Sequence, residues 1–225
     1  MKILGIDSSD NYISIGIADS YPNPAIIISR SVQVNNKNKV MIHEFLSELL
    51  QELQLDIANI DAVAVASGPG SFTGLRIGMA AAKGICWSSN IKLTGVSSLR
   101  AISLNYKNLN KNIIVVKNAK RGEFYYSAFN FSGSDFSVTI ADSVGIPSEI
   151  FKIIDEGYIP VGPGLCVLNS HIVEILKKFE DHFDPSAMGG NVAMLGYRNI
   201  INGKLMDIST GSPVYVREPR PGQAT

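Results

Sequence analysis

Short apolar runs separated by turn residues dominate the first third of the chain. Residues 2–7 form one such run, residues 12–18 place isoleucine at every second position, and residues 25–34 are again rich in isoleucine and valine. Alternation with a period of two, bounded by polar residues, indicates β-strands. Because residues 8–11 are polar turn formers, we expect a hairpin followed by a third antiparallel strand.

The pattern then changes to the helical period. Apolar residues between positions 39 and 53 recur three or four positions apart, and polar residues occupy the opposite face. This spacing is typical of an amphipathic helix. The remaining predicted elements are strands at 61–67, 91–96 and 137–141, two strands around a turn within 112–131, and helices at 75–87, 97–107, 148–156, 167–180 and 192–204.

Strands that alternate with helices indicate an α/β protein. The opening order βββαβα resembles the ribonuclease-H-like lobes of actin and the sugar kinases, so we expect two such lobes, each a mixed sheet with flanking helices. We place the first lobe, with its pairing helices, at 1–105 and a smaller, degenerate second lobe at 106–212. Residues 213–225 are proline-punctuated and predict an extended, frayed tail.

Charge is unevenly distributed although the net charge is zero. Residues 62–122 carry nine lysines and arginines and no aspartate or glutamate. Such a stretch predicts either a solvated basic face or a surface that attracts an acidic partner or nucleic acid. Strong binding of nucleic acid by this chain alone is not expected, because the chain as a whole has no excess positive charge.

The sequence gives no sign of export or membrane insertion. No apolar run approaches the ~20 residues that a membrane-spanning helix needs, and the start lacks the apolar length of a signal peptide. The two cysteines, Cys86 and Cys166, form no CxxC pair. We therefore expect a cytoplasmic protein with no membrane contact, in which both cysteines are reduced and buried.

A glycine-rich segment, SGPGSFTGLRIG at residues 67–78, is the most distinctive motif of the chain. Gly68, Gly70 and Gly74 permit backbone conformations closed to other residues, and Ser71 is placed to cap the following helix. Backbone amides at a helix N-terminus can hold a phosphate, but the lysine of a phosphate-binding loop is missing. We interpret the segment as a tight strand-to-helix turn and keep its three glycines as candidate phosphate-binding residues.

The helix after this turn is unusually narrow, with small residues from Gly78 to Gly84. Glycine within a helix costs about 1 kcal/mol relative to alanine, so close packing should compensate for it. We infer that this helix packs against the sheet on one side and another helix on the other. From the pattern alone, that second helix belongs equally well to the same chain or to a partner.

The motif at 67–78 closely resembles the signature of the TsaB (YeaZ) family, a glycoprotease-like group within the actin-like ATPase superfamily. ILGIDSS near the start, SSLRA, NAKRGEFYY, VGPG and PVYVR agree with the same family, so the resemblance covers nearly the whole chain. It implies a non-catalytic subunit that binds a catalytic paralogue, TsaD, which transfers a threonylcarbamoyl group to the adenosine beside the anticodon of tRNA.

The resemblance also implies the partners and the pairing surface. On this resemblance we expect a TsaE-type accessory ATPase in the same pathway, a homodimer in isolation, and contact with tRNA only through the complex. TsaB-like proteins pair through helices of the first lobe. The residues expected at this interface are Ile42, Phe45, Leu46, Leu49, Leu50, Arg76, Gly78, Ala81 and Ala82.

Related ATPases hold nucleotide phosphates between an aspartate and a glycine turn of the first lobe and a second aspartate of the second lobe. Here Asp7 is present, but the turn at 8–11 lacks glycine, and Asn118 stands where TsaB relatives often have aspartate. We therefore interpret Asp7 as a turn-capping residue and expect no required cofactor, with ATP or ADP bound only in a complex with the partner.

Two enzymatic alternatives stay open. An ATPase or small-molecule kinase would use Asp7 and the glycine-rich loop, and a glycoprotease-like peptidase would need a metal or a nucleophile with a base. The histidines His43, His171 and His182 include no pair spaced four apart, so no metal site is predicted. No catalytic residue is predicted either.

Overall fold

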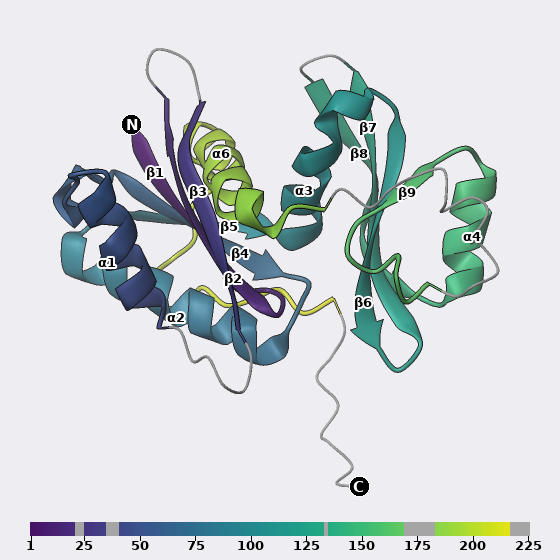
Figure 1. Ribbon diagram of the computed structural model, residues 1–225, viewed down its shortest axis with the longest axis horizontal. Coiled ribbons are helices and arrows are strands. Elements are labelled where there is room, and N and C mark those ends of the chain that lie inside the picture. Colours follow the sequence, from purple (N-terminus) through teal and green to yellow (C-terminus); the bar gives the residue numbers. More distant parts are fainter. Residues whose placement is uncertain (21–24, 35–40, 133–134, 169–182, 217–225) are drawn as a thin grey trace, which may run out of the picture.

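The structure, a computed structural model, describes residues 1–20, 25–34, 41–132, 135–168 and 183–216. Its first sheet has five strands in the order β3-β2-β1-β4-β5 (Figure 1). Strands β1 to β3 are antiparallel neighbours, whereas β4 and β5 run parallel to β1. Their bounds are β1 Lys2–Asp7, β2 Tyr12–Asp19, β3 Ala25–Gln33, β4 Ala62–Gly68 and β5 Lys92–Ser97.

The second sheet has four strands in the order β8-β7-β6-β9. A hairpin joins β6 to β7, β8 follows antiparallel to β7, and β9 lies parallel to β6. Their bounds are β6 Asn112–Lys120, β7 Glu123–Ser132, β8 Asp135–Gly145 and β9 Ile159–Val161.

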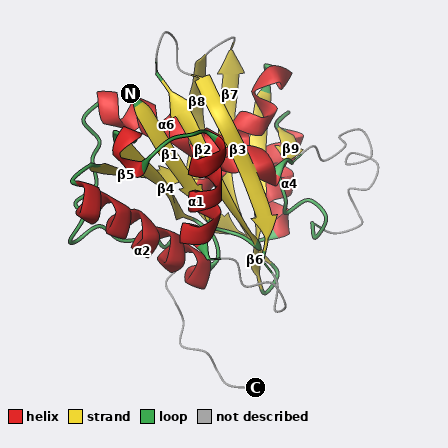
Figure 2. Cartoon of the chain, turned by 60° about the vertical axis from the view of Figure 1, so that its left-hand side comes forward, coloured by secondary structure: helices red, strands yellow, loops and turns green. Residues whose placement is uncertain are grey.

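The helices form layers outside and between the two sheets. Figure 1 shows α1 and α2 on the outer side of the first sheet, α4 on the outer side of the second, and α3 and α6 between them. Figure 2 shows α1 and α2 side by side across the strands of the first sheet. Their bounds are α1 Ile42–Glu52, α2 Phe72–Ser89, α3 Ser98–Ser103, α4 Pro147–Asp155 and α6 Met188–Ile201, with 3₁₀ turns at Ile57–Asn59, Leu104–Leu109 and Pro185–Ala187.

Both faces of the first sheet are buried, and residue size differs between them. Val63 and Val65 of β4 lie in the apolar core beneath α1 and α2, whereas Ala62 and Ala64 lie in the core shared with α6 and the second sheet. Successive side chains of a strand point to opposite faces. The small alanines of β4 therefore all lie on the face that α6 covers, and the helix can approach that face closely.

Helix α6 lies unusually close to the strands. A Cβ atom at Gly5 of β1 would come within 2.0 Å of the Gly189 carbonyl oxygen, and one at Gly16 of β2 within 2.3 Å of the Gly190 amide. The Gly190 amide also donates to the Ser29 hydroxyl at 2.9 Å. Because both the strands and the helix have glycine at these positions, the backbone of α6 can contact the backbone of the sheet directly.

The α/β class is confirmed, and most predicted elements occur near their predicted positions. The helix expected at 97–107 ends as an α-helix at Ser103 and continues as a 3₁₀ turn. The helix expected at 167–180 lies almost wholly outside the described residues. Helix α6 falls within the range proposed for the second lobe, yet it covers the first sheet.

The segment after α6 is held against the first lobe. The Met206 amide donates to the Leu93 carbonyl at 2.8 Å, and the Val214 amide donates to the Ser67 carbonyl at 2.7 Å. The ring of Tyr215 lies 5.2 Å from that of Phe72. Residues 214 and 215, expected in a frayed tail, are thus anchored, while 217–225 lie outside the described residues.

The two cysteines differ in environment. Cys86 on α2 is buried, and burial raises the pKa of its thiol to about 11. Cys166, which we expected to be buried, is exposed. It follows the glycine turn at Gly162 and Gly164, where the chain leaves the second sheet, so packing does not cover its side chain.

Candidate functional site

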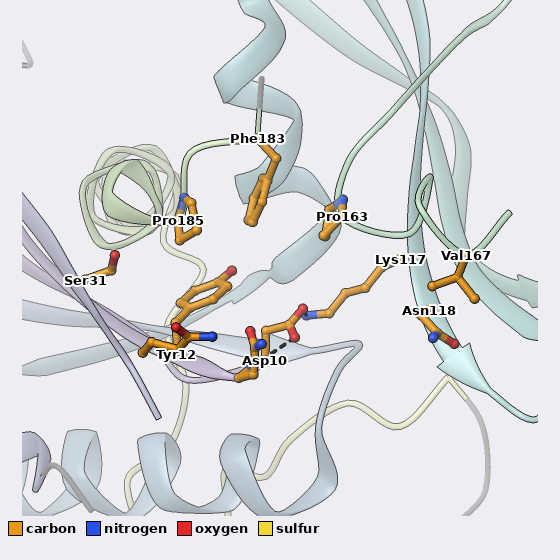
Figure 3. A pocket seen from close by; sticks show the side chains of 11 residues that line it. Asp10, Tyr12, Ser31, Lys117, Asn118, Pro163, Val167, Phe183 and Pro185 are labelled. Atoms are coloured by element: carbon orange, nitrogen blue, oxygen red, sulfur yellow. Dashed lines mark hydrogen bonds and ion pairs between the residues drawn. The ribbon is translucent and has the colours of Figure 1, made fainter. Parts of the chain in front are cut away.

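Three segments meet between the sheets. The β1–β2 turn, the loop from β4 into α2, and the end of β6 with its hairpin line two adjacent cavities of about 510 and 480 Å³. Asp10, Lys117 and Asn118 line both cavities. In Figure 3, Asp10 and Lys117 point toward each other from opposite sides of the space.

Asp7 organises the β1–β2 turn. It is fully buried, and its carboxylate accepts hydrogen bonds from the Ser9 amide at 2.9 Å and the Tyr12 hydroxyl at 3.2 Å. Burial, followed by the negative charges of Asp7 and Asp10, raises the pKa of Tyr12 well above its ordinary value. The bond to an amide two residues on is the turn-capping role predicted for Asp7.

The glycine-rich loop packs on this turn. The Ser71 amide donates to the Ser9 carbonyl at 2.8 Å. A Cβ atom at Gly70 would lie 2.3 Å from the same carbonyl oxygen, and one at Gly74 would lie 2.0 Å from the Ser8 carbonyl oxygen. The Gly74 amide donates to the Ser71 hydroxyl at 3.3 Å, which confirms the predicted serine cap. Close contact within the chain therefore accounts for both glycines.

Gly68 and Gly78 are also accounted for by contacts within the chain. Gly68 has φ of +124°, a conformation that side chains disfavour, and its Cβ would lie 2.5 Å from the Val214 carbonyl oxygen. A Cβ at Gly78 would lie 2.3 Å from the Ser8 hydroxyl. Of the three glycines considered for phosphate binding, only Gly70 lines the 480 Å³ cavity, and protein atoms stand where a side chain of each glycine would begin.

Lys117 on β6 crosses from the second sheet to the first lobe. Only 4% of its surface is exposed. Its ammonium donates to the carbonyl and the hydroxyl of Ser9, both at 2.9 Å, and pairs with the Asp10 carboxylate at 3.3 Å. The sequence did not single out this residue, because its partners lie more than a hundred positions away in the chain.

The hairpin tip after Lys117 carries two exposed cations. Lys120 and Arg121 both have positive φ, 63° and 57°, a region that costs non-glycine residues roughly 1–2 kcal/mol. The Asn118 side chain accepts a hydrogen bond from the Lys120 amide at 2.7 Å, which supports this conformation. Both cations line the 480 Å³ cavity, so the basic stretch of the sequence forms part of the cleft rim.

Five of the nine residues predicted for the partner interface are buried, and the prediction is wrong for them. They lie in the core beneath α1 and α2 or against the β1–β2 turn, and so are not available to a partner: these are Ile42, Leu46, Leu49, Gly78 and Ala82. Of the others, Arg76 is exposed, and Phe45, Leu50 and Ala81 are half-buried.

The exposed face of α2 is apolar as well. Ile77 is 51% exposed and Trp87 is 74% exposed, and Ala80 and Gly84 lie exposed between them. Periodicity missed this face because the opposite face, with Leu75 to Cys86, carries an apolar stripe of the same period. Tertiary contacts alone decide which stripe meets the sheet.

Metal binding finds no support in the described part of the chain. There, no three His, Cys, Asp or Glu side chains lie close enough to hold a metal ion. His43 is exposed on α1, and His171 and His182 lie outside the described residues. Among the described helices, none is long and apolar enough to cross a membrane.

The two mixed sheets with flanking helices and the cavities between them define a two-lobed α/β protein. YeaZ from Pseudomonas aeruginosa has the same fold, with a TM-score of 0.76 over 95% of this chain and 99% of that chain at 18% identity. Residues 33–198 match the family described as tRNA N6-adenosine threonylcarbamoyltransferase, TsaD. The chain belongs to this family, within its TsaB (YeaZ) group.

Curated relatives carry the description tRNA threonylcarbamoyladenosine biosynthesis protein TsaB. The Bacillus subtilis protein is 28% identical over 161 residues, which is 72% of this chain and 69% of that protein. The Escherichia coli protein is 26% identical over 131 residues, 57% of this chain and 55% of that protein. The matched region thus spans between about half and two thirds of these relatives.

Proposed function

We propose that this chain acts in the biosynthesis of threonylcarbamoyladenosine in tRNA as a non-catalytic subunit that binds a TsaD-type paralogue. The paralogue transfers the threonylcarbamoyl group, and this chain supplies a surface that orders it. Sequence similarity to the TsaB proteins supports a role in this pathway. The observation that best supports partner binding is the exposed apolar face of α2.

The composition of α2 supports a partner on its outer face. An exposed helix normally carries many charges on its solvent side, but the only charged residues of α2 are Arg76 and Lys83. Both are engaged within the chain, with the Tyr215 hydroxyl at 3.2 Å and the Ser209 carbonyl at 3.1 Å. Exposed tryptophan and isoleucine beside small residues suit the core of a helix-to-helix interface.

The cleft supports a non-catalytic role. A general base must be able to reach a proton of the substrate, whereas the Asp7 carboxylate is fully buried and already accepts hydrogen bonds from the Ser9 amide and the Tyr12 hydroxyl. In this proposal the chain forms a homodimer alone, exchanges that partner for the paralogue, and works in the cytoplasm with a TsaE-type ATPase. tRNA is then reached through the assembled complex.

A mixing experiment tests the surface. Ile77→Glu combined with Trp87→Glu should weaken pairing with the paralogue, and self-association, at least about tenfold, because it places charges in an apolar contact. Size-exclusion and calorimetric titration would measure both. Since both side chains are exposed, thermal unfolding should change little.

Ile146→Glu is a matched control. Ile146 is 52% exposed, like Ile77, but lies before α4 in the second lobe, so its replacement should leave pairing intact. Equal weakening by both variants would remove the α2 surface from the proposal. Full tRNA modification by the paralogue without this chain would remove the subunit role itself.

A further inference from the structure

The resemblance to ATPases implies a nucleotide whose phosphates would lie between the first hairpin turn and the second lobe. In this chain Lys117 of β6 extends into the space between the β1–β2 turn and the second sheet. We infer that the Lys117 ammonium takes the place that nucleotide phosphates would need. Its contacts connect the two lobes and leave no site there for a magnesium nucleotide.

The ammonium group is fully used. A lysine ammonium has three donors, and three acceptors surround this one: the carbonyl oxygen of Ser9, the hydroxyl of Ser9 and the carboxylate of Asp10. No proton is left to bind a phosphate oxygen. A nucleotide would therefore have to break these contacts before it could approach.

The acceptors for this cation are fixed by the first lobe. The Ser9 carbonyl also accepts the Ser71 amide at 2.8 Å, and the Ser9 amide donates to buried Asp7 at 2.9 Å. The turn and the glycine-rich loop therefore hold one another in place. Lys117 binds a preformed acceptor group rather than a mobile loop.

The residues that would serve a metal-bound phosphate do not fit that role. A magnesium site needs oxygen ligands that are free to coordinate, but the Asp7 carboxylate is fully buried and bonded to Ser9 and Tyr12. The amides of Ser71 and Gly74, which a phosphate would need, already donate to the Ser9 carbonyl and the Ser71 hydroxyl, and the Ser9 and Ser8 carbonyl oxygens lie close beside Gly70 and Gly74.

The contact spans the molecule. Lys117 belongs to β6 of the second sheet, and Ser9 and Asp10 belong to the turn after β1 of the first. In a nucleotide-dependent member of this fold class, closure of the lobes would depend on the ligand. Here a side chain of the protein provides it, so the relative placement of the lobes does not depend on nucleotide.

Hydrogen exchange on the isolated protein tests whether Lys117 connects the two lobes through Ser9 and Asp10. Lys117→Met keeps an unbranched stem and removes the charge, so amide exchange in residues 8–11 and 71–74 should become about tenfold faster or more, as loss of a charge-assisted bond implies. Lys111→Met, an exposed lysine just before β6, should leave these amides unchanged.

Two further variants keep the test decisive if Lys117→Met folds poorly. Asp10→Asn removes only the ion pair and should give a smaller acceleration in the same amides. Lys117→Ala leaves a cation-sized space beside Ser9 and Asp10, so millimolar methylammonium should raise its melting temperature and not that of the wild-type protein. Unchanged exchange in both charge-removing variants would overturn the connection between the lobes through Lys117.

Calorimetry with magnesium and ATP tests whether Lys117 excludes a nucleotide from the space between the lobes. The wild-type protein should give no binding at millimolar nucleotide. Measurable binding by the wild-type protein would show that Lys117 does not exclude a nucleotide from this position. Neither experiment involves tRNA or the paralogue, so the outcome is independent of the proposed role in tRNA modification.

Discussion

Two glycines of α2 look alike in the sequence and differ in the structure. A Cβ at Gly78 would lie 2.3 Å from the Ser8 hydroxyl, whereas a Cβ at Gly84 would meet nothing within 4 Å. The sequence predicts a narrow helix from both residues, but only Gly78 is required by close packing. Gly84 lies on the exposed face instead.

The two alanine variants should therefore have opposite effects on stability. Gly78→Ala should lower the free energy of unfolding by about 1–3 kcal/mol, because the new methyl group displaces the Ser8 hydroxyl from its 2.8 Å hydrogen bond to the Gly74 carbonyl. Gly84→Ala should raise it by roughly 0.4–1 kcal/mol through helix propensity and a less flexible unfolded chain. Urea unfolding of both variants checks this, and a shift of the same sign in both would contradict it.

At the scale of the element, periodicity predicts where helices and strands lie but not which face they bury. Strands β1 to β7 lie close to the predicted runs because their apolar residues are continuous or alternate. The strand β9, Ile159–Val161, was missed because three residues give no measurable period. On α2 both faces are apolar, so the pattern did not show that Gly78 and Ala82 face inward. On α1 the predicted interface residues Ile42, Leu46 and Leu49 belong to the stripe that packs on the sheet.

One exposed carboxylate stabilises the turn at 207–210, within the segment after α6. The Asp207 carboxylate accepts hydrogen bonds from the Thr210 amide at 2.7 Å, the Thr210 hydroxyl at 2.9 Å and the Ser209 amide at 2.9 Å. The bonds from Thr210, then that from Ser209 and the charge of Lys83, lower the pKa of Asp207 below its ordinary value of 3.8.

A lowered pKa fixes the direction of the pH effect. The turn at 207–210 should be fully stabilised above about pH 4 and lose this contribution as the pH falls through the lowered pKa of Asp207. Amide exchange at Ser209 and Thr210, corrected for intrinsic rates, should therefore rise at acid pH. Asp207→Ala should exchange quickly at every pH, and a variant with wild-type protection would contradict the assignment.

At the scale of the molecule, the two sheets share an apolar core, and a half-buried carboxyl lies at its edge. The hydroxyls of Ser97, at the end of β5, and of Ser127 on β7 act on this carboxyl, which belongs to Asp142 of β8. Burial raises the pKa of Asp142 above its ordinary value, although these hydroxyls and the charge of Arg100 oppose the shift.

Asp142 should accordingly lower stability at neutral pH relative to a neutral side chain of the same shape. Its folded pKa lies above its unfolded value, so the folded protein binds the proton more tightly and stability from this group is gained as the pH falls. Asp142→Asn should unfold at higher urea than the wild-type protein at pH 7. The difference should shrink toward pH 4, and a constant difference would refute the explanation.

The sequence also limits what can be predicted for the whole molecule. Two α/β lobes follow from the order of elements, and the turn-capping role predicted for Asp7 agrees with its hydrogen bond to the Ser9 amide. The phosphate-binding role considered for Asp7, Gly68, Gly70 and Gly74 stays a prediction. The contact of Lys117 with Ser9 could not be predicted, because it depends on the angle between two sheets. The packing of α6 on the first sheet could not be predicted either, because the glycines of α6 lie close to strand glycines that are far away in the sequence.

The position of α6 has a consequence for synthesis on the ribosome. A nascent chain that has emerged through β5 has every strand of the first sheet but lacks the helix that covers one of its faces. Ala62, Ala64 and their neighbours then stay in water until Met188 and the residues after it appear. The first lobe is therefore completed last, and a chain cut short before α6 would present an apolar surface to chaperones and proteases.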